Sequence, residues 1–200
     1  MPYDSRMAGM REHWRRTAMQ AIQEKALDLF DERGFAAVTI EEIAAAAEVS
    51  PSSVYRYFRT KEGLLAADEF ELMSSEELAA LLDPRDPVGS LVAAVARYET
   101  TPGEGSETPD LPRRRIRYFF QVPAVRAAVL ATLDRASARI AARLAEAGGR
   151  SVAQARAYAN ALAFGYFAAL EVWFEDGGRR PIAEYVAEAL APLRTAWSTP

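Results

Sequence analysis

The sequence of 200 residues contains no cysteine and only one histidine, and each scarcity excludes a class of site. Without cysteine there is neither a disulfide framework nor a thiolate metal site. The single histidine, His13, lies near the start of the chain, so neither a Ser-His-Asp nor a Cys-His arrangement can be built in the core. No stretch shows the Glu-x-x-His metal pattern of helical bundles. We therefore expect no enzyme, no metal and no cofactor, with a site made of carboxylates alone left open.

Long apolar runs and an excess of positive charge are also missing. No apolar run reaches the roughly 18 residues of a membrane-spanning helix, and residues 1–16 lack the apolar region of a signal peptide. We therefore expect a cytoplasmic protein without a membrane partner. The formal net charge is −4, but affinity for nucleic acid depends on cations placed near phosphates rather than on total charge. Arg6, Arg11, Arg15 and Arg16 provide a local excess of cations at the start of the chain.

The composition favours helix. Half of the residues are hydrophobic, alanine and arginine are abundant, and β-branched residues are few. Helical periodicity, capping residues and prolines predict an all-α fold of about nine helices. Among them we expect a first helix over 13–33 and a long fourth helix over 61–82. The expected organisation is a flexible basic arm (1–12), a helix-turn-helix DNA-binding domain (13–60) and a helical effector-binding and dimerisation domain (61–200).

Residues 39–61 carry the most specific pattern. Thr39 followed by Glu42 is a capping box, which satisfies amide donors at a helix start. Ser50 before Pro51 is a second start signal, because serine caps well and proline has no donor to lose at the first helical position. These signals predict a short helix ending near Ala47 and a second helix over 51–58, which is the helix-turn-helix layout. Two amphipathic helices of an ordinary bundle are the alternative.

The run Thr39-Ile40-x-x-Ile43-Ala44-x-x-Ala47-x-Val49-Ser50-x-x-x-Val54-Tyr55-x-Tyr57-Phe58-x-x-Lys61-Glu62-x-Leu64-Leu65 closely resembles the amino-terminal DNA-binding domain of tetracycline-repressor-type (TetR family) regulators. The resemblance is specific over about residues 17–65, and beyond them it rests on the number and lengths of the helices. It implies contact with DNA at the matching positions, where the tyrosine and the lysine usually bind phosphate. With Arg56 added from its outward position, the expected DNA-binding residues are Thr39, Ser50, Pro51, Ser52, Ser53, Tyr55, Arg56, Tyr57 and Lys61.

Glu48 departs from the pattern of that family, which usually has glycine in the turn between the two helices. A left-handed conformation is expected at this position, and there a residue with a side chain bears a modest strain.

The last two predicted helices carry more apolar surface than one chain needs. The helix over 152–175 has more than one apolar stripe, and the helix that starts at Pro181 has another. One stripe packs inside the chain, and the second indicates an interface with another copy. Two helices per chain paired about a two-fold axis give a four-helix interface, which the resemblance also implies; a monomer is the alternative. The expected interface residues are Phe167, Leu170, Phe174, Tyr185, Ala189 and Leu193.

These observations indicate a ligand-responsive repressor. It would bind a palindromic operator in double-stranded DNA as a homodimer and leave it when a small, mainly apolar effector binds; a helical adaptor that binds a protein partner is the alternative. The arginines at 113–117 form either an anion site for the effector or a solvated face paired with acidic side chains of the two preceding helices. The expected lining of the effector pocket is Tyr98, Arg113, Arg117, Tyr118, Phe119, Tyr158, Phe164, Tyr166 and Trp173.

Overall fold

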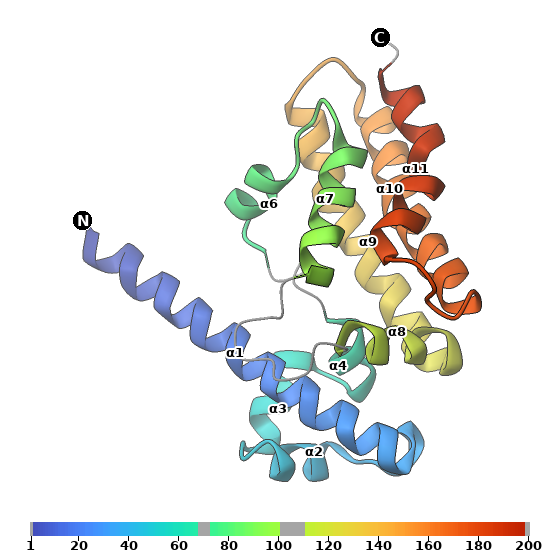
Figure 1. Ribbon diagram of the computed structural model, residues 1–200. Coiled ribbons are helices and arrows are strands. Elements are labelled where there is room, and N and C mark those ends of the chain that lie inside the picture. Colours follow the sequence, from blue (N-terminus) through green and yellow to red (C-terminus); the bar gives the residue numbers. More distant parts are fainter. Residues whose placement is uncertain (1, 68–72, 101–110, 199–200) are drawn as a thin grey trace. The chain divides into compact units, whose positions relative to one another are not determined.

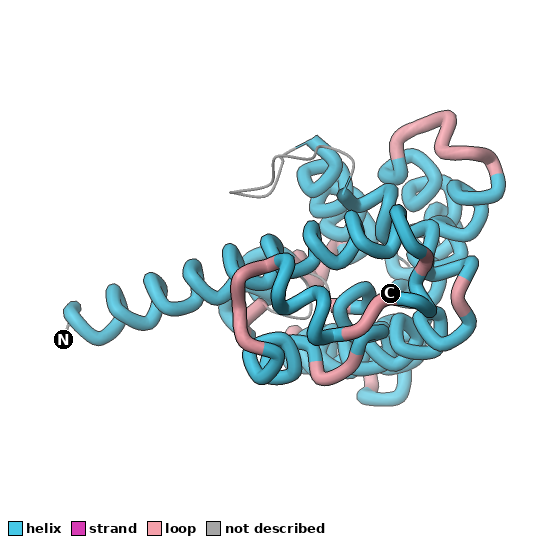
Figure 2. Tube along the Cα trace, turned by 90° about the horizontal axis from the view of Figure 1, so that it is seen from below, coloured by secondary structure: helices cyan, strands magenta, loops and turns pink. Residues whose placement is uncertain are grey.

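The protein is described from a computed structural model, which covers residues 2–67, 73–100 and 111–198. Over these residues the chain forms α-helices, one short 3-10 helix and connecting loops, with no β-strand (Figure 2). The predicted all-α fold is therefore confirmed. The chain divides into two compact units, Met1–Leu65 with Pro102–Arg115 and Ala66–Thr101 with Ile116–Pro200. Among the described helices, none combines the length and the hydropathy needed to span a bilayer.

The first unit is built on α1 (Pro2–Arg33), whose second half packs against the first two of the four short elements that follow it (Figure 1). These elements are η1 (Phe35–Ala37), α2 (Ile40–Ala46), α3 (Pro51–Phe58) and α4 (Lys61–Ala66). From Met19 to Phe30, apolar side chains recur along α1 at the spacing of a single helical stripe, so this face of the second half of α1 is buried. The core of this unit comprises Met19, Ile22, Ala26, Leu27, Phe30, Val38, Ile43, Val54, Phe58, Leu64 and Leu65.

The start of α1 differs from the prediction. The helix begins at Pro2, whereas the sequence predicted an arm over 1–12 and a helix from 13. Proline is tolerated at the first helical position, because the amide of that residue has no intrahelical partner. The next helix breaker is Gly9, and a single glycine costs only about 1 kcal/mol relative to alanine. In both views this first part of α1 extends beyond the other helices of its unit (Figures 1 and 2).

The predicted fourth helix over 61–82 is not continuous. The structure has α4 up to Ala66 and a separate α6 (Ser75–Leu81), and residues 68–72 lie outside the described part of the chain. The second start is a complete capping box: Glu77 donates its amide to the Ser74 hydroxyl at 3.1 Å, and its carboxylate accepts the Ser74 amide at 2.7 Å. A new helix therefore begins at Ser75, a signal that the prediction did not use.

The second unit is a layered set of longer helices. It contains α7 (Pro87–Thr100), α9 (Pro123–Glu146), α10 (Val152–Glu175) and α11 (Ile182–Ser198), and α8 (Leu111–Gln121) begins in the first unit and ends in this one. α10 packs against both α9 and α11, and α11 also packs against α7 (Figure 1). α10 has the bounds that its Ser151–Gln154 capping box and the Asp176-Gly177-Gly178 stop predicted.

Gly165 explains how α10 and α11 come close together. A β-carbon at this position would lie only 2.6 Å from Cδ2 of Leu190, which is fully buried. The missing side chain therefore lets Leu190 of α11 sit against the backbone of α10.

Candidate functional site

The start of α2 is held by the predicted capping box. The amide of Glu42 donates to the Thr39 hydroxyl at 3.2 Å, and the Thr39 amide donates to the Glu42 carboxylate at 2.8 Å. Arg33 pairs with the other oxygen of Glu42 at 2.8 Å. The Thr39 amide, then Arg33 and the Thr39 hydroxyl, lower the pKa of the Glu42 carboxyl from its ordinary value. Thr39 is exposed beside this capping box.

The turn between α2 and α3 has the left-handed conformation that was expected from the resemblance. Glu48 adopts a φ of 55°. Its amide donates to Ala45 at 3.2 Å, and the amide of Val49 donates to Ala44 at 2.9 Å, which closes the end of α2. The backbone therefore takes the conformation that glycine adopts most easily, and Glu48 holds it at a modest strain.

Three serine hydroxyls gather at the start of α3. Ser50 caps the helix by accepting the amide of Ser53 at 3.2 Å, as predicted. Its hydroxyl also lies 2.9 Å from that of Ser52 and 3.0 Å from that of Ser53. Pro51 occupies the first turn, so it leaves no amide donor without a partner. This cluster puts hydroxyl donors and the positive end of the helix dipole on one exposed surface, where an anion is favoured.

The outer side of α3 carries its aromatic and basic side chains. Val54 and Phe58 are buried beneath them, while Tyr55 is 47% exposed. Arg56 is exposed and lies over the ring of Tyr57 at 4.8 Å, and it donates a hydrogen bond to the phenol oxygen at 3.2 Å. The structure thus brings most of the predicted DNA-binding residues together on one side of a helix of eight residues.

Lys61 has another surrounding than the resemblance implied. Its ammonium group donates to the carbonyl of Phe35 at 2.8 Å and to the carbonyl of Val38 at 2.9 Å. The same nitrogen lies 4.4 Å from the centre of the Phe35 ring. The side chain is half-buried and is bound to the connection between α1 and α2.

A tight turn joins α3 to α4. Arg59 has a φ of 65° and a ψ of −44°, and the amide of Thr60 donates to the carbonyl of Phe58 at 2.7 Å. This is the hydrogen bond of a γ-turn in its strained form, which is rare for residues with a side chain. The hydroxyl of Thr60 then caps α4 by accepting the amide of Gly63 at 3.0 Å. Sequence reasoning missed the γ-turn, because neither glycine nor asparagine marks it.

The aromatic residues that were predicted to line a pocket have several different environments. Tyr118, Phe119 and Trp173 are each 5% exposed and belong to the core. The indole of Trp173 donates to the carbonyl of Arg180 at 3.2 Å, which holds the connection between α10 and α11. Tyr98 and Tyr166 are half-buried, whereas Phe164 is 38% exposed.

Tyr158 lies near the start of α7 and the last part of α11. Its hydroxyl donates to the carbonyl of Leu193 at 3.3 Å. Burial, and then the negative charge of Asp86, raise the pKa of Tyr158 to about 12, against a smaller opposing effect of Arg150.

One arginine at the start of α8 has an intramolecular role. Arg114 donates from Nε to Asp31 at 2.7 Å and from Nη2 to Asp28 at 2.8 Å, so its guanidinium forms a fork with α1. The sequence predicted pairing with acidic residues of the preceding two helices as one alternative; the pairing occurs, but with α1. Arg113 is exposed, and Arg117 lies 5.1 Å from the centre of the Tyr118 ring.

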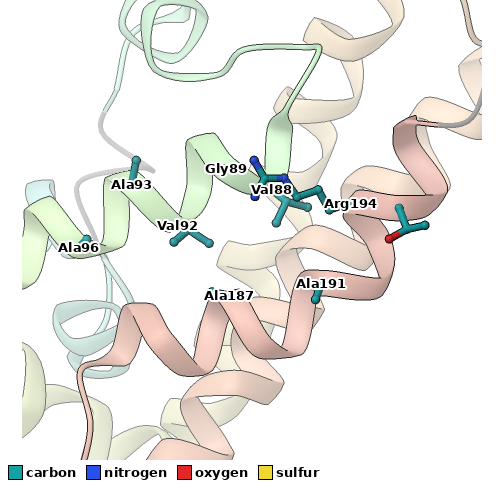
Figure 3. Close-up of a pocket in the computed structure, with 9 residues that line it drawn as sticks. Val88, Gly89, Val92, Ala93, Ala96, Ala187, Ala191 and Arg194 are labelled. Atoms are coloured by element: carbon teal, nitrogen blue, oxygen red, sulfur yellow. The ribbon is translucent and has the colours of Figure 1, made fainter.

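A cavity of about 780 Å³ lies between α7 and α11 (Figure 3). Arg194 reaches from α11 across one end of it and pairs with Asp86 at the start of α7. Glu99, near the end of α7, binds the first amides of α11. At 1.5 Å per residue, these two contacts lie about 20 Å apart along α7. The lining comprises Val88, Gly89, Val92, Ala93, Ala96, Ala187, Ala191, Arg194 and Thr195, and it includes none of the residues predicted to bind the effector.

The predicted interface residues are mostly turned inward. Phe167, Leu170 and Tyr185 are at most 5% exposed, so they have almost no surface left for a second chain. Phe174 and Leu193 are half-buried, and Ala189 is exposed. Another stripe of α10 is open at the surface at spacings of three and four residues. This apolar stripe comprises the exposed Ala153, Ala157, Phe164, Ala168 and Val172 and the half-buried Ala161. Its alanines escaped sequence reasoning because alanine is common on both buried and exposed helix faces.

Comparison with known proteins agrees with this geometry. A model of the family described as "Bacterial regulatory proteins, tetR family" matches residues 22–67, which contain α2, α3 and α4. The HTH-type transcriptional regulator BetI of Paraburkholderia phytofirmans is 31% identical over 155 residues, which are 70% of this chain and 77% of that protein.

Two solved structures share the fold over most of their length. NalD of Pseudomonas aeruginosa, described as the secondary repressor of the MexAB-OprM multidrug efflux pump, is 20% identical with a TM-score of 0.54, and the match covers 90% of this chain and 94% of that one. SmeT, the repressor of the Stenotrophomonas maltophilia multidrug efflux pump SmeDEF, is 20% identical with a TM-score of 0.54 and covers 89% of each chain. At this identity the likeness concerns the fold.

Proposed function

Because the chain belongs to the tetR family of bacterial regulatory proteins, we propose that it is a homodimeric repressor that binds a palindromic operator and leaves it when a small, mainly apolar effector binds. The observation that carries the proposal is the outer side of α3. Ser50, Ser52, Tyr55 and Arg56 are exposed there together, above the buried Val54 and Phe58. Hydroxyls and a guanidinium on a short helix after a tight turn suit the major groove and its phosphates.

Selection of bound oligonucleotides from a random pool tests the DNA part of this proposal. We expect the purified protein to enrich a palindrome whose half-sites lie about one helical turn, 34–36 Å, apart. Arg56→Gln should weaken binding to the selected sequence. Arg85→Gln is the matched control, because it removes the same charge from an exposed arginine outside the first unit. Equal affinities of the two variants, or no enriched sequence, would contradict the proposal.

The apolar stripe of α10 supports the homodimer. From Ala153 to Val172 it contains no charged residue, and Phe164 and Val172 are 38% and 53% exposed. At 1.5 Å per residue the stripe is about 28 Å long. A second copy placed about a two-fold axis covers it with the same stripe, which removes the apolar surface of both chains from water.

Sedimentation of two alanine variants tests the dimer. Ala168→Glu puts a charge into the stripe, and we expect it to shift the protein from dimer to monomer. Ala138→Glu puts the same charge on an exposed position of α9 and should leave the dimer intact. A monomeric wild-type protein, or two variants that behave alike, would speak against this interface.

The cavity between α7 and α11 supports an apolar effector. Its lining is made of valine, alanine and glycine except at the end that carries Arg194 and Thr195. Small side chains on two facing helices leave a slot that an elongated apolar molecule fills, with its polar end near Arg194. The binding of such a molecule shifts the equilibrium only when it prefers the state with low affinity for DNA.

Variants that fill the cavity between α7 and α11 test whether the effector binds there. Apolar compounds are screened for release of the selected DNA, and the active compound is then measured on Ala93→Leu and Ala191→Leu. We expect both variants to bind DNA like the wild type and to respond weakly to the compound. Ala138→Leu on α9 is the control that adds the same volume elsewhere. If the compound releases DNA from Ala93→Leu and Ala191→Leu as it does from the wild type, the effector binds outside this cavity.

A further inference from the structure

We propose that Lys61 is a positioning residue for DNA recognition: it holds the connection between α1 and α2 and thereby the place of Thr39, instead of binding an operator phosphate. This inference rests on the proposed binding of operator DNA. It assigns to Lys61 a role other than the one that the resemblance implies, on the geometry of its ammonium group.

The first step is the number of contacts that the Lys61 ammonium makes. An ammonium has three donors, and two of them are directed at the carbonyls of Phe35 and Val38, at 2.8 and 2.9 Å. The Phe35 ring lies 4.4 Å from the same nitrogen, so its face adds a cation–π contact. Hydrogen bonds from a charged donor are the stronger kind, so turning the ammonium away from these carbonyls toward a phosphate would cost two strong bonds.

The second step is what the two carbonyls belong to. Phe35 lies in η1, a helix of three residues that buries none of them, and Gly34 before it has a φ of 84°. Apart from the buried Val38, the packing of this connection is therefore sparse, and its one ring contact joins Phe35 and Phe30 at 5.0 Å. Val38 comes directly before Thr39, whose backbone and hydroxyl start α2. Lys61 thus ties the first residue of α4 to the residue next to the α2 cap.

The third step follows from the position of Lys61 in the chain. It is the first residue of α4 and comes two residues after Arg59, where the γ-turn ends α3. Lys61 therefore connects the end of α3 with the start of α2. Its partners Phe35 and Val38 lie 26 and 23 residues earlier in the chain. Its loss frees Thr39 relative to α3, and both are expected to contact the same DNA.

The experiment measures the affinity of the full-length protein for the selected operator over a range of salt concentrations. Lys61→Met keeps the length of the side chain and removes its donors and its charge. For a positioning role we expect an affinity loss of about tenfold at low salt. The slope of log affinity against log salt should change by less than about half a unit, whereas loss of a phosphate contact lowers it by about one. Arg59→Gln removes the charge of an exposed neighbouring arginine, and its slope of log affinity against log salt is compared with that of Lys61→Met.

A double-mutant cycle with Thr39→Ala completes the test. When Lys61 acts through Thr39, Lys61→Met weakens binding much less in the Thr39→Ala background than in the wild type. Additive losses together with a slope lower by about one would overturn the proposal, as would wild-type affinity of Lys61→Met. Wild-type affinity with a lowered melting temperature would show a purely structural role, and it also overturns the proposal. Failure of the wild type to select any DNA would instead refute the proposed function.

Discussion

Glu99, near the end of α7, caps α11 at Ile182. Its Oε1 accepts the amide of Ile182 at 2.6 Å, and its Oε2 accepts the amide of Ala183 at 3.0 Å. The two helices have opposite directions: this contact joins them at one end, and the ion pair of Asp86 with Arg194 joins them at the other. A carboxylate at the start of a helix satisfies amides that have no intrahelical partner and complements the helix dipole.

Removal of this cap should destabilise the protein. We expect Glu99→Ala to lower the free energy of unfolding by about 1–3 kcal/mol, because two amides lose a charged acceptor. Urea unfolding followed by circular dichroism measures the change. An unchanged m value shows that the variant exposes the same amount of surface on unfolding as the wild type. Glu175→Gln, an exposed residue in the last turn of α10, is the control and should stay within about 0.5 kcal/mol of the wild type.

Gly63 should not tolerate even one added methyl group. A β-carbon there would lie 2.1 Å from the carbonyl oxygen of Phe58, a backbone atom that cannot rotate away. Helix propensity alone predicts that Gly63→Ala stabilises α4 by about 1 kcal/mol. We expect the opposite sign, a loss of about 1–3 kcal/mol, because the backbone between α3 and α4 must move. Thermal melting distinguishes the two, and a higher melting temperature would contradict the close approach.

Glycine should relieve strain at Glu48. With a φ of 55°, this residue has the left-handed conformation that costs a residue with a side chain about 1–2 kcal/mol. Glu48→Gly regains this energy but loses part of it, because glycine makes the unfolded chain more flexible. We therefore expect the free energy of unfolding to stay the same or to rise by up to about 1 kcal/mol. A clear destabilisation in a chemical unfolding curve would reject the left-handed turn.

Tyr158 should ionise late in an alkaline titration. Burial first, and Asp86 second, raise its pKa to about 12, whereas in the unfolded chain the pKa is about 10. Between these values the folded protein keeps the proton and the unfolded chain releases it, so stability falls as the pH rises through this window. Tyrosinate absorbance should show a late step that Tyr158→Phe removes, and the variant should lose less stability there. Identical titration curves of the two proteins would contradict this assignment.

Local signals in the sequence predicted much of the fold. Capping boxes join residues three apart, so Thr39 with Glu42 and Ser151 with Gln154 marked the starts of α2 and α10 without knowledge of the rest of the chain. Ser50 before Pro51 marked the start of α3 in the same way. The left-handed turn at Glu48 was expected from the resemblance. The outer side of α3, from Ser50 to Tyr57, could be predicted from these local signals and from helical periodicity.

The contacts between distant residues were decided by the packing of helices. Lys61 reaches carbonyls 26 and 23 residues away, and Glu99 reaches amides 83 and 84 residues away. No periodicity encodes such pairs, because Lys61 and Glu99 are ordinary charged residues in the sequence, and their partners are backbone groups. Packing also decided which stripe of α10 faces outward. Large apolar side chains lie on more than one side of this helix, and the contacts with α9 and α11 bury Phe167 and Leu170 in the core. The alanine-rich stripe with Phe164 and Val172 was then left at the surface, since a helix can bury only the faces that its neighbours cover.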